Sequence, residues 1–412
     1  MTPATAVAVP AAGPPDGREH RGERWAAGVP AGDQAEVGMS RRLRNTTPAL
    51  RHGWHPVALS TEVGDEPVAV RLLGENWVIA RLDHTLAAFA DRCPHRLAPL
   101  SAGRVEAEEL VCGYHGWRFV ASGECTAVPA LGPGMPAPRR ARAVPAWGAA
   151  ERHGLVWIAP QEPVADLIDL PEEREAGFDT VWLSPTRTTA CAGLLADNFL
   201  DTAHFPFVHA GTIGAGEDTV VPLHRVTPDG DGFLVQMEQV VANPEDPLVA
   251  TGEHDLVQRR WSTYVYRPPF MLRLRLEYPD AGAISTILFC LQPEDVDATR
   301  IYTRLLRDDL GGDAARLAEA ARFEQQVLDE DLALQERFDL DGLPLVGDNA
   351  QPAEEVSTRA DAAGVALRRT LAALVERSAS MAAAGGAGAP ASTRERRVAG
   401  TRRADHRRPT IR

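Results

Sequence analysis

Two short segments decide how this sequence is interpreted: Cys93-Pro-His95-Arg and Cys112-Gly-Tyr-His115-Gly-Trp, with sixteen residues between His95 and Cys112. Each segment supplies one thiolate and one imidazole. Such a set suits a [2Fe–2S] cluster with cysteines on one iron and histidines on the other, or a tetrahedral zinc site. Zinc patterns typically place Cys with Cys and His with His. The mixed segments therefore favour the cluster over zinc, and over four unrelated core residues.

A second group of candidate ligands follows at Asp197-Asn-Phe-Leu-Asp201-Thr-Ala-His204-Phe-Pro-Phe-Val-His209. Asp197, Asp201 and His204 stand at i, i+4 and i+7, which predicts that they share one face of a helix. On an ideal helix His209 would point away from that face. Pro206 is expected to end or kink the helix, so that His209 turns back toward the same metal.

These residues resemble a known family. Residues 91–103 and 112–119 are similar to the Rieske signatures of the non-heme iron, aromatic-ring-hydroxylating oxygenases, and Asp201–His209 resembles their D-x₂-H-x₄-H iron motif. The resemblance implies that His204 and His209 bind Fe(II). It also implies that Asp201, without binding metal, links His204 to His115 of a neighbouring subunit. Asn198 matches an asparagine that some members carry near the iron.

Two histidines need one carboxylate to complete a facial triad that leaves positions open for O₂ and substrate. A helix expected at 313–338 offers Asp329, Glu330 and Asp331. An apolar stripe is predicted along this helix, formed by Phe323, Val327, Leu334 and Phe338. Asp331 falls within that stripe, whereas Asp329 and Glu330 are expected to point toward solvent. An acid on a buried face is costly unless it is paired or metal-bound, so Asp331 is the predicted third ligand.

The order of the segments predicts an α+β fold. Short β-type runs at 68–73, 77–82 and 155–158 suit a small antiparallel domain, and a Pro-rich linker is expected at 160–171. Antiparallel strands at 263–266, 271–278 and 283–290 and helices at 313–338 and 360–377 follow. The expected parts are a disordered segment at 1–45, a Rieske domain at 46–160, a catalytic iron domain at 161–378 and a disordered Arg-rich tail at 379–412. The family resemblance implies that the second sheet grips the long helix. Met39 is an alternative start.

Composition restricts the class of partner. The net charge is −14, and residues 393–412 carry eight Arg against Glu395 and Asp405, which leaves about −20 on the rest (−14 minus +6). An acidic body argues against nucleic acid. No apolar run approaches the roughly 20 residues that span a bilayer, and no secretory signal is visible. We therefore expect a cytoplasmic protein with no membrane partner. Cys125, Cys191 and Cys290 are expected to be buried free thiols.

The resemblance implies a terminal oxygenase, similar in its motifs to the vanillate O-demethylase-like monooxygenases. Such an enzyme uses O₂ and electrons from NAD(P)H, delivered by a reductase with or without a ferredoxin, to hydroxylate or O- or N-demethylate an aromatic or heterocyclic molecule. A homotrimer is implied. Alternatives are another oxidation in natural-product tailoring (oxidative cyclisation, N-oxygenation or cis-dihydroxylation) and a non-catalytic Rieske electron carrier.

The sequence offers no site for the nicotinamide itself. Gly211-Thr-Ile-Gly-Ala-Gly does not match the dinucleotide fingerprint and is expected to be a loop near the iron. The pocket over the iron is expected to be lined by Phe199, Phe205, Phe207 and the Leu/Arg strand at 271–278.

Overall fold

The computed structural model describes residues 42–214, 219–345 and 355–385. Met39 and most of the two segments predicted to be disordered lie outside these residues. The described chain begins with β1 (Arg42–Leu43), which pairs with β20 (Leu343–Pro344). The Asn45 amide, 1% exposed, donates to Ala298 and Asp295 carbonyls and to Thr299. Residues 42–45, which were expected to belong to a disordered segment, are therefore part of the fold.

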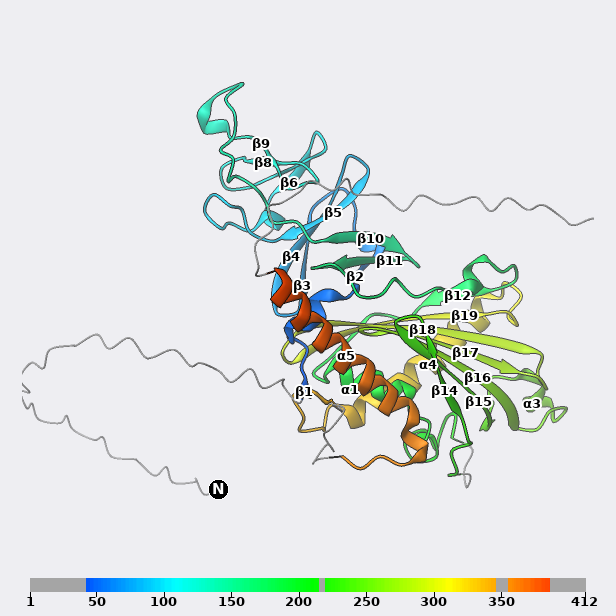
Figure 1. The fold of residues 1–412 in the computed structure, drawn as a ribbon. Helices are drawn as coiled ribbons and strands as arrows, with labels where there is room; N and C mark the ends of the chain where they lie inside the picture. Colours follow the sequence, from blue (N-terminus) through cyan, green and yellow to red (C-terminus); the bar gives the residue numbers. More distant parts are fainter. Residues whose placement is uncertain (1–41, 215–218, 346–354, 386–412) are drawn as a thin grey trace, which may run out of the picture. The chain divides into compact units, whose positions relative to one another are not determined.

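The first half of the chain forms three small antiparallel sheets, with the strand orders β3-β4-β5, β10-β11-β2 and β6-β7-β8-β9 (Figure 1). Their strands are β2 (His55–Leu59), β3 (Val68–Leu72), β4 (Glu75–Leu82), β5 (Thr85–Ala90), β6 (Arg104–Glu106), β7 (Glu109–Val111), β8 (Arg118–Phe119), β9 (Cys125–Ala127), β10 (Gly148–Arg152) and β11 (Leu155–Ala159). The runs predicted at 68–73, 77–82 and 155–158 are confirmed as β3, β4 and β11. A separate core gathers Val78, Phe89, Leu110 and Phe119 around the two cysteines of the opening motif.

The second half is built on one antiparallel sheet with the strand order β12-β19-β18-β17-β16-β15-β14, in which β13 also pairs with β19. Its strands are β12 (Asp179–Trp182), β13 (Thr186–Thr188), β14 (Arg225–Asp229), β15 (Gly232–Ala242), β16 (Val257–Arg267), β17 (Met271–Tyr278), β18 (Ala283–Asp295) and β19 (Ala298–Arg307). The antiparallel strands predicted at 263–266, 271–278 and 283–290 are thus confirmed within β16, β17 and β18.

Alternation along these strands decides what each face covers, because successive side chains point to opposite faces. In β18, Ile287 and Phe289 join the core that holds the helices, whereas Leu288 and Cys290 join a second core with Trp157. That second core also contains Ile168 and Leu170, both at most 1% exposed. The Pro-rich segment at 160–171 is therefore packed against the sheet and does not behave as a free linker.

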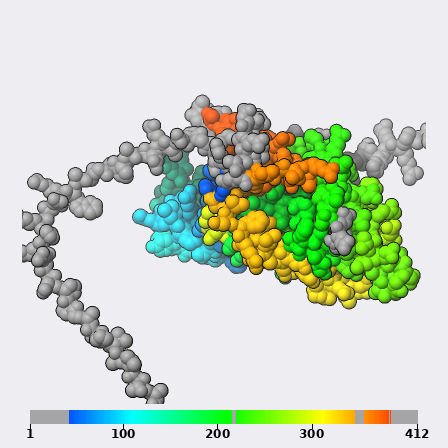
Figure 2. Space-filling view, turned by 90° about the horizontal axis from the view of Figure 1, so that it is seen from below, coloured from blue at the N-terminus to red at the C-terminus, as the bar shows by residue number. Residues whose placement is uncertain are grey.

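Five α-helices complete the described fold: α1 (Ala192–Leu200), α2 (Phe205–Val208), α3 (Pro247–Thr251), α4 (Ala314–Gln335) and α5 (Ala362–Gly385). Asp313 caps α4 by accepting from the amides of Ala315 and Arg316. Figure 2 shows α5, in orange, beside the green segment that carries α1, which it contacts. α5 continues to Gly385, beyond the expected start of the tail at 379. Among the described residues, no helix is both long enough and apolar enough to cross a bilayer.

Candidate metal centres and substrate pocket

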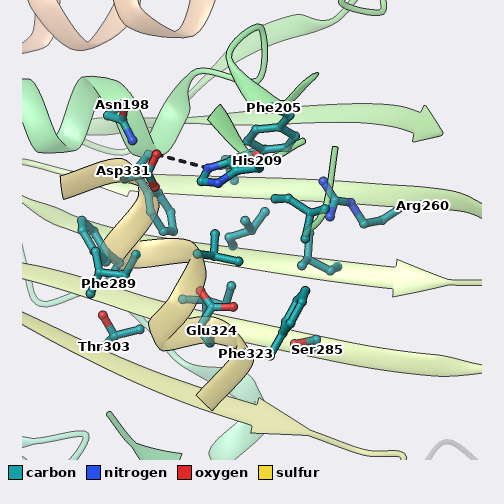
Figure 3. A pocket seen from close by; sticks show the side chains of 18 of the residues that line it. Asn198, Phe205, His209, Arg260, Ser285, Phe289, Thr303, Phe323, Glu324 and Asp331 are labelled. Atoms are coloured by element: carbon teal, nitrogen blue, oxygen red, sulfur yellow. Dashed lines mark ion pairs between the residues drawn. The ribbon is translucent and has the colours of Figure 1, made fainter. Parts of the chain in front are cut away.

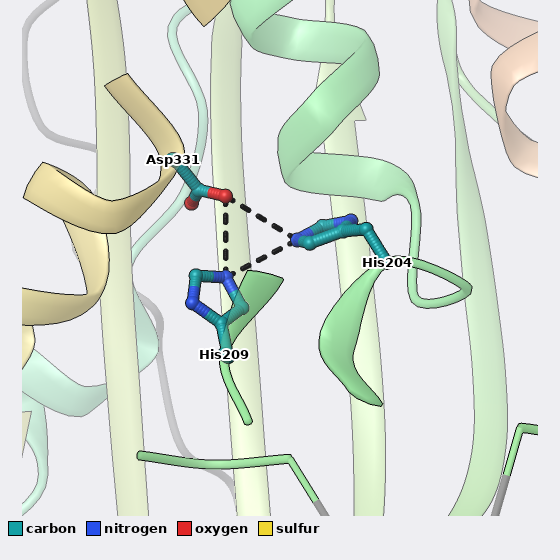
Figure 4. Close-up of side chains that lie close together, drawn as sticks. All are labelled: His204, His209 and Asp331. Carbon is teal, nitrogen blue, oxygen red and sulfur yellow. Dashed lines mark hydrogen bonds and ion pairs between the residues drawn. The ribbon is translucent and has the colours of Figure 1, made fainter. Parts of the chain in front are cut away.

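Three side chains from two parts of the chain converge on one point (Figure 4). Nε2 of His204 lies 3.2 Å from Nε2 of His209. Oδ1 of Asp331, on α4, lies 3.4 Å from the first nitrogen and 3.2 Å from the second. Donor atoms of a facial triad, each about 2.1 Å from one ion, lie about 3 Å apart. The three donors thus have the spacing that an octahedral metal requires of one face.

The pKa values and contacts of His204 and Asp331 show whether the three donor side chains suit a metal ion. Burial opposes protonation of His204, yet the carboxylates of Asp201 and Asp331 raise its pKa to about 9. Burial also disfavours the Asp331 carboxylate, but the side chains of His204, His209 and Asn198 hold its pKa well below the usual range. Oδ1 of Asp331 is buried, and neither imidazole nitrogen beside it is aligned for a hydrogen bond, so these contacts are electrostatic. A divalent cation would replace the protons between these atoms, so the residues fit a metal ion.

The two segments of the opening motif form mirrored loops. In each loop the cysteine amide donates to the carbonyl five residues on: Cys93 to Ala98 and Cys112 to Trp117, both at 2.8 Å. In each loop the amide four residues on donates back to the cysteine carbonyl at 2.9 Å, from Leu97 and from Gly116. That fourth residue has a positive φ in both, 61° at Leu97 and 70° at Gly116, where glycine is unstrained.

These loops bring the four predicted ligands together in pairs. Cys93 and Cys112 are 1% and 2% exposed. Burial raises the pKa of the Cys93 thiol to about 11, and the neighbouring Cys112 thiol adds to this increase. The rings of His95 and His115 meet edge to face, with centroids 4.5 Å apart. Nδ1 of His95 is buried without a hydrogen-bond partner among the described residues. A thiol pair and an imidazole pair fit a two-iron cluster with a different ligand type on each iron.

Comparison with known proteins agrees with both groups of candidate ligands, the Cys/His loops and the His/His/Asp triad. The Rieske [2Fe–2S] domain family matches residues 53–147, and the vanillate O-demethylase oxygenase C-terminal domain family matches residues 188–377. Methylxanthine N1-demethylase NdmA of Pseudomonas putida is 31% identical over 343 residues, which cover 79% of this chain and 90% of that protein. The chain belongs to the Rieske non-heme iron oxygenases.

Two further likenesses agree with this membership. The solved structure of P. putida NdmA with caffeine matches with a TM-score of 0.68 at 26% identity, covering 82% of this chain and 94% of that one. A vanillate O-demethylase oxygenase subunit from a Pseudomonas species is 28% identical over 246 residues, which cover 56% of this chain and 66% of that protein. As a Rieske oxygenase, this enzyme carries a [2Fe–2S] cluster and a ferrous ion as cofactors, and the predicted α+β fold is confirmed.

In this Rieske oxygenase each histidine of the triad also contacts a carboxylate through its other nitrogen. Oδ2 of Asp201 lies 3.2 Å from Nδ1 of His204, and Oε2 of Glu330 lies 2.8 Å from Nδ1 of His209. Glu330 also accepts from Thr212 at 2.9 Å. The prediction that Glu330 points toward solvent is therefore wrong. Its longer side chain reaches back across α4 to the loop after His209, a contact that helical phase alone does not reveal.

The expected shared helix face of Asp197, Asp201 and His204 is also wrong. α1 ends at Leu200, because Asp201 adopts extended backbone angles (φ −85°, ψ 137°) and its Oδ1 accepts from the Ala203 amide. His204 stands at the start of α2, and Pro206 occupies the first turn of α2, where proline is tolerated. Pro206 therefore does not end the first helix. Asp197 instead pairs with Arg368 of α5 at 2.6 and 2.8 Å.

The predicted apolar stripe of α4 holds only in part. Phe323 and Val327 line the pocket, but Leu334 and Phe338 are each 42% exposed. The buried positions toward the end of α4 are Leu328, Leu332 and Gln335. Asp331 nevertheless lies where the stripe placed it, because it follows Val327 by four residues, on the face that closes the pocket.

The triad opens into a mostly apolar pocket between the sheet and α4 (Figure 3). Phe199, Phe205 and the Leu274 and Leu276 side chains line it, as predicted. Phe207 does not, since it lies on the outer side of α2 and is 72% exposed. Tyr278, in the predicted strand, also lines the pocket. Its other polar lining residues were not predicted, and they are Glu245, Arg260, Tyr264, Ser285, Thr303 and Glu324.

Asn198 lies between the pocket and α4. Its Oδ1 accepts from Nε2 of Gln335 at 2.8 Å, and a hydrogen bond between Asn198 and Asp331 helps to keep the Asp331 pKa low. Cys125, Cys191 and Cys290 are buried and free, as predicted. The described part of the glycine-rich segment, Gly211–Gly214, turns back so that the Gly214 amide donates to the His209 carbonyl at 2.8 Å.

Proposed function

We propose that this chain is the terminal oxygenase of a multicomponent system that removes an O- or N-linked methyl group from an aromatic or heterocyclic small molecule. The observation that carries the proposal is the convergence of His204, His209 and Asp331 at one end of an apolar pocket. Among the relatives named above, two are an N-demethylase and an O-demethylase by name. Hydroxylation at a ring or methyl carbon is the same chemistry without loss of the carbon.

The ligand assignments belong to this proposal. Cys93, Cys112, His95 and His115 would hold the cluster, and His204, His209 and Asp331 would hold the ferrous ion. Bound there, the cluster supplies single electrons and the iron supplies the activation of O₂. The mixed Cys/His pairing of the mirrored loops and the three converging donors support these assignments.

The protein's own residues prepare the site for that chemistry. Asp201 and Glu330 fix the ring orientation of the two histidines and keep Nε2 of each directed at the metal position. Asn198 helps to keep Asp331 charged by lowering the pKa of its carboxyl group. Phe199 stacks on Phe289 with centroids 4.5 Å apart, which gives a flat wall for an aromatic ring and excludes water from it.

Demethylation requires partners that this chain does not supply. One methyl–heteroatom bond is broken, the carbon leaves as formaldehyde, one O₂ is consumed, and the second oxygen leaves as water after uptake of an electron pair and protons. The electrons come from NAD(P)H through a reductase, with or without a ferredoxin. We place Asp201 as the link from His204 to His115 of a neighbouring subunit in a homotrimer. Asp201 suits this role because its side chain is 37% exposed beside the triad.

Turnover with a surrogate reductase tests the proposal. The purified chain, NADH and a reductase–ferredoxin pair are mixed with a panel of methoxybenzoates, methoxybenzamides and N-methylated purines, and formaldehyde and O₂ are measured together. We expect formaldehyde to equal the O₂ consumed for at least one member of the panel. A product that gains oxygen and retains its methyl group would instead assign hydroxylation. O₂ uptake without either product, for every compound, would contradict the proposal.

A further inference from the structure

One charged side chain in the pocket has no counter-charge. Arg260 lies on β16, whose alternate residues point to the pocket side, and it is only 2% exposed. Nη2 donates to Oε1 of Gln239 at 3.2 Å, and Nη1 lies 3.5 Å from the Tyr278 hydroxyl. The guanidinium carbon is 5.8 Å from the centre of the Phe205 ring. Figure 3 shows Arg260 at one side of the pocket, next to Phe205.

These contacts leave the guanidinium incompletely satisfied. Among the described residues, Nε of Arg260 has no hydrogen-bond partner although it is buried. No carboxylate oxygen of these residues lies within 4.0 Å of a guanidinium nitrogen, the distance of an ion pair. Gln239 is neutral, and its Oε1 already accepts from Ser262 at 2.7 Å. A buried charge without a partner is strongly unfavourable, so such groups are normally paired. Arg307 in the same sheet is also buried, but it forms ion pairs with Glu245 and Asp309, each at 2.9 Å.

The other acids that line the pocket are not available to Arg260. Glu245 is paired with Arg307, and Asp331 belongs to the triad. Glu324 lies on α4, away from Arg260 in Figure 3. Burial raises the pKa of Glu324 to about 7, and the negative charges of Glu245 and Asp331 contribute to the increase. Glu324 therefore carries less negative charge than an ordinary glutamate.

A second unused donor stands on the same strand face. Tyr264 follows Arg260 by four residues, is 1% exposed and lines the pocket. Its hydroxyl is buried without a hydrogen-bond partner among the described residues. Leaving a buried hydroxyl unpaired is unfavourable unless a ligand pairs it. Two orphaned donors, one of them cationic, therefore face the same space.

We infer that the pocket selects an aromatic substrate bearing a carboxylate, to which the Nε–H of Arg260 donates and for which the Tyr264 hydroxyl is a second donor. The inference rests on the proposed function and narrows its substrate class. Arg260 enters at one side of the pocket and the triad closes another, so the apolar ring of the substrate lies between the carboxylate and the metal position. Arg260 is then a specificity-determining residue, because a neutral analogue leaves its charge unpaired.

The preference for a carboxylate can be tested without turnover, by measuring ligand binding to the protein loaded with iron and cluster. Titration calorimetry under anaerobic conditions compares 3- and 4-methoxybenzoate with the corresponding methoxybenzamides, which have the same shape and no charge. We expect at least one carboxylate to bind about tenfold or more tightly than its amide, and Arg260→Gln to abolish that difference. Arg260→Lys, which keeps a charge but not the planar fork, restores part of it. Tyr264→Phe weakens carboxylate binding without changing amide binding.

Arg259→Gln is the matched control. Arg259 is the neighbouring residue on β16, points to the opposite face and pairs with Asp280 at 3.2 Å. Its replacement should leave the carboxylate preference unchanged, and the visible spectrum of the cluster reports whether each variant is folded. The inference is overturned if no carboxylate binds more tightly than its amide, or if Arg260→Gln behaves as Arg259→Gln does.

The outcomes separate this inference from the proposed function. Arg260-dependent binding of carboxylates without formaldehyde release from any methylated compound would contradict demethylation and leave the anion site standing. Formaldehyde release from amides and carboxylates alike, unaffected by Arg260→Gln, would contradict the anion site and leave demethylation standing.

Discussion

At His209, two neighbouring carboxylates of α4 contact the two nitrogens of one ring. Asp331 is directed at Nε2 and Glu330 at Nδ1. His204 has the same arrangement, except that Asp201 comes from its own segment. A carboxylate on the nitrogen that does not bind metal fixes the tautomer and makes the other nitrogen a stronger ligand. The side chains of Glu330 and Asp201 thus determine how well the three donors hold an ion.

Replacing Glu330 by alanine should weaken iron binding roughly tenfold to a hundredfold, because His209 loses its orienting partner. Competition with a ferrous chelator measures the affinity, while the cluster absorbance should not change. Asp329→Ala is the control, since Asp329 is exposed and, within the described parts of the chain, accepts only from Gln325 on its own helix. Equal iron affinity in the two variants would show that Glu330 has no part in holding His209.

His55 should make the protein less stable in mild acid. It is 0% exposed, and burial lowers its pKa to about 4, against the opposing hydrogen bond to the Leu50 carbonyl. Between pH 6.5 and 4 the unfolded chain binds a proton that the folded chain refuses, so the free energy of unfolding falls as the pH falls through this window. The shift corresponds to roughly 3 kcal/mol.

Urea unfolding of the wild type and of His55→Gln at pH 7 and pH 4.5 checks this dependence. The glutamine amide replaces the Nε2 donor and does not titrate. We expect the wild type to lose more stability than the variant between the two pH values. The same loss in both proteins would assign the acid sensitivity to other groups.

At the scale of elements, α5 fixes α1, and α1 carries Asn198. Arg368 of α5, with its side chain 8% exposed, pairs with Asp197 of α1 at 2.6 Å and with Glu355 at 2.9 Å. Burial raises the pKa of Asp197, against the pull of Arg368. The Asp197 carboxylate therefore depends on this partner to remain charged.

Arg368→Gln should cost about 2 kcal/mol of stability, less than a fully buried pair would, because the Asp197 side chain left without its partner is half-buried, at 27% exposed. Denaturant unfolding of the protein measures the change, and the iron affinity should fall with it as α1 loosens. Arg369→Gln is the control on the exposed side of the same helix. If Arg368→Gln lowers the free energy of unfolding by less than about 0.5 kcal/mol, as a surface substitution would, Arg368 does not hold α1 in place.

The same elements show what the sequence could predict. Leu/Arg alternation in β17 and the capped α4 follow from local periodicity. The motif resemblance pointed to His204 and His209, helical phase pointed to Asp331, and the structure brings the three side chains together. The end of α1 was missed because the Asp201 side chain bonds to the Ala203 amide and stops the helix, which periodicity does not encode. Arg260 and Glu330 were missed because their partners lie far away in sequence.

For the whole molecule, Asp201 is the residue that we expect to act between subunits. Burial opposes ionisation of Asp201, but the hydrogen bonds from His204 and the Ala203 amide lower its pKa, so it stays charged near neutral pH. Asp201→Ala, supplied with excess ferrous ion so that both metal centres are filled, should lose coupled turnover, with formaldehyde falling relative to the wild type at equal iron content. Full product yield from this variant would contradict the bridging role.

The proposed ligand set places an iron at His204, His209 and Asp331 in addition to a cluster at Cys93, His95, Cys112 and His115. The most direct test is the iron and acid-labile sulfide content of the wild type, of Asp331→Ala and of the matched Asp329→Ala. We predict about three irons and about two sulfides per chain in the wild type and in Asp329→Ala. Asp331→Ala should lose one iron and keep both sulfides. An iron content unchanged in Asp331→Ala would contradict the assignment.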